Sequence, residues 1–156
     1  MQQRLIELGW PTELLFLPLL LGGAACVLGA EVGRRVRFRS MRRFYSVCAL
    51  LCGVGTLLVG LAPAWGGLFG MMLVQGTLEV YLLHESQKLN DAIPSDQRAT
   101  LISVDSMAYS LLMIPASPLV GALGDAFGQA GAGLAALGAA ILASGLAAGL
   151  FGSNKP

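Results

Sequence analysis

The stretch LNDAIPSDQRATLISVDSMAYSLLMIPASPLVGALGDAFG, residues 89–128, joins a polar segment, an apolar run and a closing turn. The polar segment contains Pro94 and ends at a single arginine, Arg98. The apolar run carries small hydroxyl residues at three- and four-residue steps, which share one helix face: Thr100, Ser103, Ser106 and Ser110. The stretch therefore predicts a loop, a membrane-spanning helix and a second turn, Gly124-Asp125-Ala126-Phe127-Gly128.

The composition of the whole chain supports a membrane location. Of its 156 residues, 55% are hydrophobic and only 12% are charged, against about 25% charged residues in a typical soluble domain. The chain also has 21 glycines, and small residues let membrane helices approach closely. We therefore expect an all-α, polytopic membrane protein with about five transmembrane helices.

Apolar runs of roughly the 20 residues that span a bilayer define the helices of a single membrane domain, residues 1–156. The expected spans are 14–32, 44–61, 65–83, 99–123 and 130–151. Two polar segments, 34–43 and 84–98, separate the first span from the second and the third from the fourth.

The distribution of Lys and Arg predicts the orientation, because cytoplasmic loops carry an excess of these residues. Six arginines lie within 34–43, Lys88 and Arg98 lie within 84–98, and Lys155 lies in the C-terminal tail. The intervening turns, 62–64 and 124–129, have neither Lys nor Arg. We expect a multi-pass protein of the plasma (cytoplasmic) membrane, with the N-terminus outside, the C-terminus in the cytoplasm, and cytoplasmic loops 34–43 and 84–98.

The stretch 89–128 resembles the end of the tenth helix and the eleventh helix of major facilitator superfamily transporters, in their bacterial, drug-exporter-like branch. A pattern of the form LN…IPS…RAT…S…S…PL.G.L.D..G carries the resemblance. Its positions are occupied by Leu89, Asn90, Ile93, Pro94, Ser95, Arg98, Ala99, Thr100, Ser103, Ser106, Pro118, Leu119, Gly121, Asp125 and Gly128. The other spans agree in order, length and orientation.

The resemblance implies that the five spans are helices eight to twelve of a twelve-helix carrier. It implies alternating access, in which two six-helix halves rock about a midplane site, with proton-coupled efflux of a small-molecule substrate. The expected partners are the lipid bilayer and either a missing N-terminal half, on the same or a separate polypeptide, or further copies of this chain. The alternative is a truncated or partner-dependent membrane module without transport activity of its own.

Glu79 is the first candidate for transport chemistry, with Gln75 four residues earlier on the same helix face. A charged side chain at membrane depth costs at least ~2.5–3.5 kcal/mol on insertion scales, so it normally faces a cavity or a partner. Proton-coupled carriers use such carboxylates. The competing interpretation places Glu79 close enough to the cytoplasmic face to reach the interface.

Asp105 and Tyr109 are further candidates within the fourth span. Asp105 is a possible cavity carboxylate, or it pairs with Arg98 near the membrane surface, seven residues earlier on roughly the same face. Tyr109 is a possible aromatic wall for a drug-like ligand, although packing is the commoner role of such a residue. The hydroxyl residues of this span predict a helix-packing face more than a substrate path.

Arg34 and Arg35, together with Gly29, Glu31 and Gly33, loosely resemble the basic signature between helices eight and nine of these carriers. They are candidates for gating or for anchoring the topology, and the basic loop also suits anionic lipid. Asp125 matches the family-like end of helix eleven, and a turn also favours a carboxylate there.

Other classes of function lack their motifs. The sequence has no GxSxG, no HExxH, no P-loop and no paired metal-ligand motif. We therefore expect no enzyme, no catalytic residue, no metal site and no cofactor. The net charge of +1 gives no indication of nucleic-acid binding.

Overall fold

A computed structural model gives the structure of the chain and describes residues 5–6, 9–36, 40–93, 97–126, 128 and 130–151. A short 3-10 helix, η1 (Thr12–Leu14), precedes five α-helices, and no strand occurs in these ranges. The helices are α2 (Phe16–Arg35), α3 (Met41–Leu61), α4 (Ala64–Ala92), α5 (Arg98–Ala126) and α6 (Ala130–Phe151). The all-helical architecture expected from the apolar runs is therefore confirmed.

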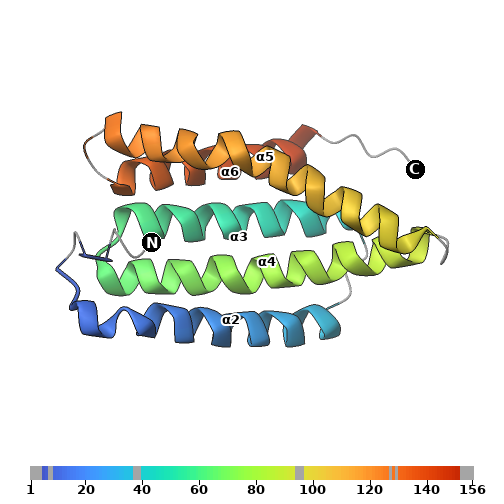
Figure 1. Cartoon of the computed structure of the whole chain (residues 1–156), viewed down its shortest axis with the longest axis horizontal. Helices are drawn as coiled ribbons and strands as arrows, with labels where there is room; N and C mark the ends of the chain where they lie inside the picture. Colours follow the sequence, from blue (N-terminus) through green and yellow to red (C-terminus); the bar gives the residue numbers. More distant parts are fainter. Residues whose placement is uncertain are drawn as a thin grey trace.

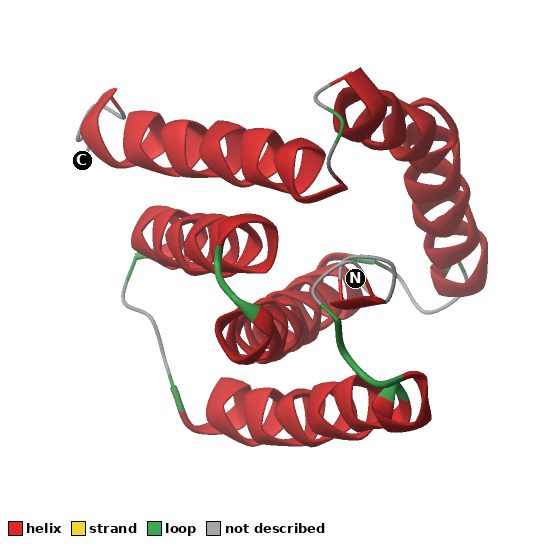
Figure 2. Ribbon diagram, turned by 90° about the vertical axis from the view of Figure 1, so that its left-hand side faces the viewer, coloured by secondary structure: helices red, strands yellow, loops and turns green. Residues whose placement is uncertain are grey.

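Successive helices run antiparallel (Figure 1). The extensively packed pairs are α2 with α4, α4 with α3, α3 with α6, and α6 with α5. The spatial order is therefore α2–α4–α3–α6–α5. Figure 2 shows α5 standing apart from the layer that α2, α3 and α4 form.

Four helical segments are long and apolar enough to cross a membrane: Thr12–Arg35, Met41–Leu61, Ala64–Ala92 and Ala99–Ala126. Within the described part of α6, Gly131–Ala147 is a shorter apolar segment. These helices are those of a multi-pass membrane protein. The third is longer than hydrocarbon requires, because 29 residues extend about 43 Å at the helical rise of about 1.5 Å per residue, against a core of about 30 Å.

The ends of the helices differ from the expected spans. Residues 84–92, predicted to begin a loop, continue α4 as helix. The helix ends only where Ile93 becomes extended, as expected for a residue that precedes a proline. The basic segment 34–43 likewise contributes the last residues of α2 and the first of α3. Residues 124–126 belong to α5 and not to a turn, although Gly128, with φ +66°, lies in the turn that follows.

Glycines set the distances between the packed helices. A methyl group added at Gly29 of α2 would collide with the backbone of Gly76 in α4. At Gly55 of α3 it would lie 2.8 Å from the carbonyl oxygen of Gly70 in α4. At Gly145 of α6 it would lie 2.9 Å from Cβ of Ala49 in α3. The close approach expected from the many glycines therefore occurs between α3 and α6, and it also holds α2 and α3 against α4.

The two ends of the bundle differ in composition. The antiparallel order brings the end of α2, the start of α3, the end of α4 and the start of α5 to one end, which we call the arginine-rich end (Figure 1). It carries Arg34, Arg35, Arg42, Arg43 and Lys88. At the opposite end, Leu5 and Trp10 pack on Leu68, and the Trp10 ring meets that of Trp65 edge-on at 5.0 Å.

Candidate functional site

Gln75 and Glu79 lie one turn apart on α4, and both are half-buried. Gln75 borders a small cavity of about 170 Å³ between α3, α4 and α6, which Thr56 and Leu134 also line. Its side chain also approaches α2, with Cγ and Nε2 3.9 Å from where a Cβ at Gly22 would stand. Glu79 is one turn nearer the arginine-rich end. The described structure gives its carboxylate no hydrogen bond and no ion pair.

The depth of Glu79 follows from the polar residues that succeed it. Four residues, Val80 to Leu83, separate it from His84, the first of the polar run that ends α4. Five helical steps correspond to about 7.5 Å along the axis. Glu79 therefore lies within the apolar part of α4, where an ionised carboxylate requires water or a partner. The site lies one and a half turns from the polar run, and the interfacial interpretation of Glu79 stays a prediction.

The candidates on α5 are exposed to the surroundings of the bundle. All residues from 99 to 119 are exposed, including Asp105 and Tyr109. The Ser106 hydroxyl donates to the Ile102 carbonyl at 3.0 Å, and Ser110 donates to the Ser106 carbonyl at 2.9 Å. Their hydroxyls are thus satisfied within α5. No described helix covers this face, so the predicted packing role would need a partner outside these residues.

The two sets of candidates are not brought together. The pairs of helices that pack extensively do not include α4 with α5, so no packed interface joins Gln75 and Glu79 to Asp105 and Tyr109. The side chain of Arg98 lies outside the described residues, and with it the predicted pair with Asp105. Asp125 is exposed in the last turn of α5, and its carbonyl accepts a 3.0 Å hydrogen bond from the Gly128 backbone nitrogen.

Arg34 and Arg35 both bond to Glu31 on their own helix. The Arg35 Nε donates to Glu31 Oε1 at 2.6 Å, and the Arg34 guanidinium binds the other carboxylate oxygen. The arginine side chains remain 69% and 77% exposed, so these pairs contribute little to stability. These contacts lie within α2 and do not join two helices. They leave most of each guanidinium open to a ligand at the arginine-rich end.

A polar group that sequence reasoning missed joins α3 to α4 at the same end. The Tyr45 hydroxyl donates to Glu85 and accepts from Lys88, and the Lys88 Nζ lies 3.6 Å from Glu85. The ammonium also stands 4.7 Å from the centre of the Tyr45 ring, a cation–π distance. We call Tyr45, Glu85 and Lys88 the tyrosine cluster. The spacing of Glu85 and Lys88 indicates their pairing, but nothing in the sequence assigns Tyr45 to them.

Aromatic rings extend this group into the bundle. Phe44 is completely buried and stacks on His84 with ring centres 4.5 Å apart. His84 contacts the Val80 carbonyl through Nδ1 at 3.1 Å. The arrangement explains how His84 and Glu85, predicted to border a loop, are held within a helix. It contains no set of metal ligands, and none occurs elsewhere among the described residues.

Comparison with protein-family models, with curated proteins and with solved structures gives no match for this chain.

Proposed function

We propose that this chain forms one wall of the pathway of a secondary active carrier, which exports a small solute by alternating access in exchange for protons. The observation that carries the proposal is Glu79, a carboxylate in the apolar part of α4 without a partner among the described residues. A carboxylate in such a place is expected to face water or a ligand, and it is suited to bind a proton or a cation.

Gln75 supports the same assignment, because it adds a polar side chain one turn away on the same face. The uncovered α5 supports the requirement for further helices, whether they belong to the same polypeptide or to another one. In a carrier of this kind the solute site lies between two halves. The resemblance of residues 89–128 to the eleventh helix of major facilitator carriers points to the same class.

The exposure of α5 also favours a second candidate, a membrane module that binds partner helices and has no transport activity. Its exposed residues, from 99 to 119, provide a long surface for such binding. On this alternative Glu79 completes an interface with the partner, where a hydrogen bond or an opposite charge satisfies it.

The two candidates are distinguished by proton-driven export of ethidium, a probe chosen because it is a lipophilic cation. Ethidium accumulation is measured in cells that lack the gene and in cells in which the full coding region is restored. The carrier predicts lower accumulation in the restored cells, and an uncoupler that collapses the proton gradient removes the difference. Equal accumulation in both favours the non-transporting module.

Two variants test the role of the carboxylate in this assay. Glu79→Gln keeps the shape of the side chain and removes its charge, so export is expected to be lost. Glu13→Gln makes the same change at an exposed position in η1, where export is expected to remain. Full export by Glu79→Gln would exclude Glu79 from the coupling.

A further inference from the structure

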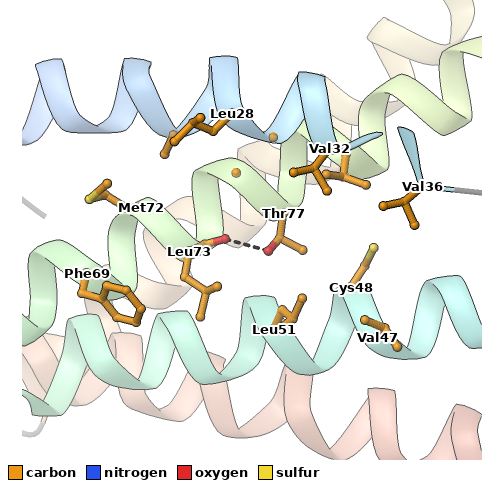
Figure 3. A pocket seen from close by; sticks show the side chains of 14 residues that line it. Leu28, Val32, Val36, Val47, Cys48, Leu51, Phe69, Met72, Leu73 and Thr77 are labelled. Carbon is orange, nitrogen blue, oxygen red and sulfur yellow. Dashed lines mark hydrogen bonds between the residues drawn. The ribbon is translucent and has the colours of Figure 1, made fainter. Parts of the chain in front are cut away.

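An apolar groove of about 360 Å³ lies between α2 and α3, above one face of α4 (Figure 3). Leu28 and Val32 of α2 form one side, and Val47 and Leu51 of α3 form the other. The four side chains are between 40% and 63% exposed. The groove therefore opens to the surroundings of the bundle, and its size falls in the range of about 300–1,000 Å³ that is common for ligand sites.

The base of the groove offers no free polar atom to a ligand. Thr77 is buried there, and its hydroxyl donates to the Leu73 carbonyl of its own helix at 2.7 Å (Figure 3). Gly76, next to it, lies against Gly29 of α2 and closes that side. A hydrocarbon chain fits this lining, because it requires no hydrogen bond and gains contact with apolar side chains.

The groove ends at Val36 and Val47, at the arginine-rich end of the bundle. Arg35 follows Val32 by three residues, and Arg43 precedes Val47 by four, so each shares a helix face with a residue of the groove wall. Both arginines are exposed. They therefore flank the end of the groove from its two sides, at the height where the polar part of a lipid would lie.

The charge at this end selects an anion. Six arginines and no Asp or Glu occur between Val32 and Phe44 in the sequence. Glu31 is bonded to Arg34 and Arg35, and Glu85 and Asp91 of α4 lie at the same end, so these three carboxylates offset only part of this charge. Arginine is suited to phosphate because its planar group donates parallel hydrogen bonds to two oxygens. Basic pockets between membrane helices bind anionic head groups for the same reason.

We propose that the groove between α2 and α3 binds one anionic phospholipid, with an acyl chain along Leu28, Val32 and Leu51 and the head-group phosphate between Arg35 and Arg43. The apolar lining of the groove suits the acyl chain, and the arginines at its end suit the anionic head group. A zwitterionic lipid fits the groove but lacks the net charge, and a soluble anion lacks the chain. The inference is independent of transport, since it uses neither Glu79 nor α5.

Native mass spectrometry of the full chain in detergent tests the proposal with dioleoyl-phosphatidylglycerol and dioleoyl-phosphatidylcholine, which share their acyl chains. Phosphatidylglycerol is expected to bind more tightly. Arg35→Gln with Arg43→Gln should weaken its binding by about tenfold or more, because each basic residue near an anionic lipid contributes about 1 kcal/mol. Lys88→Gln with Lys155→Gln removes the same charge from two lysines that belong to neither α2 nor α3, the helices that carry Arg35 and Arg43, and should leave this binding unchanged.

A second measurement locates the lipid. Phosphatidylglycerol with a photoreactive group on its chain is expected to label the walls of the groove. Val47→Trp, which fills the groove, should reduce the labelling. If this variant does not fold, the exposed arginine substitutions still decide the question.

Three results would overturn the proposal. They are equal binding of the two lipids, equal weakening by the two pairs of substitutions, and labelling confined to other helices. The first two indicate a non-specific lipid shell. A fourth result, a second copy of the chain bound in the groove in place of the lipid, would also exclude the proposal.

Discussion

The carboxylates of this chain differ most in their immediate neighbours. Glu31 binds two arginines on its own helix, and Glu85 accepts from Tyr45 beside Lys88. Glu79 has no such neighbour in the described structure, although it lies deeper in the apolar part of its helix than Glu85. A charged group without a partner is costly in hydrocarbon. This contrast singles out Glu79 for a function that the other two cannot serve.

The tyrosine cluster gives a prediction for a single hydroxyl group. Tyr45→Phe removes the oxygen that joins Glu85 and Lys88 across two helices. We expect the Tm of the chain in detergent to fall by about 2–4 °C, the shift that the loss of one hydrogen bond produces at this size. Tyr109→Phe removes the same group from an exposed ring and should leave the Tm unchanged. Equal effects of the two substitutions would show that the cluster does not stabilise the bundle.

At the scale of the helices, the contact of α2 with α4 depends on the absence of a side chain at Gly29. Gly29→Ala would force its methyl group against the Gly76 backbone, so we expect a loss of about 1–3 kcal/mol in the free energy of unfolding, typical of overpacking. Gly23→Ala, in the same helix, meets nothing within 4 Å and serves as the control. Reversible unfolding in mixed micelles measures both, and a neutral Gly29→Ala would contradict the packing described for α2 and α4.

Hydropathy predicted the existence of the helices but not where each of them ends. Hydropathy measures transfer into hydrocarbon, and most of residues 84–92 are polar. The segment was therefore predicted to be a loop. They stay helical because contacts beyond the apolar run hold them, among them Tyr45 with Glu85 and Phe44 with His84. The end of α4 was still foreseeable, since Pro94 restricts the residue before it.

At the scale of the whole molecule, α5 is incompletely covered. Its packing on α6 leaves residues 99–119 exposed, including the face that carries the hydroxyl residues. We predict that a photoreactive residue in place of Ser106 cross-links to another polypeptide or to a second copy in membranes. The same group in place of Val27, which is 71% exposed on α2, should react with lipid only. Cross-linking to lipid alone from both positions would contradict the need for further helices.

The candidate site was only partly predictable from the sequence, because part of it depends on which helices pack together. The position of Glu79 within an apolar run is visible in the sequence, because it depends on local composition. The tyrosine cluster and the lipid groove depend on which helices are neighbours, and α4 lies between α2 and α3 although it follows both in the chain. The pairing of Arg34 and Arg35 with Glu31 could have been predicted from the sequence, since three- and four-residue spacings bring helical side chains together.

The accessibility of position 79 to water is the most direct test of the proposed pathway. Cys26, Cys48 and Cys52 are first replaced by alanine, and a single cysteine is introduced as Glu79→Cys or, for comparison, as Val27→Cys. A charged, membrane-impermeant methanethiosulfonate is then applied to native membranes. We predict that the cysteine at 79 reacts and that the lipid-facing cysteine at 27 does not. If the cysteine at 79 does not react when the reagent is applied from either side of the membrane, the assignment of this face of α4 to a solute pathway is contradicted.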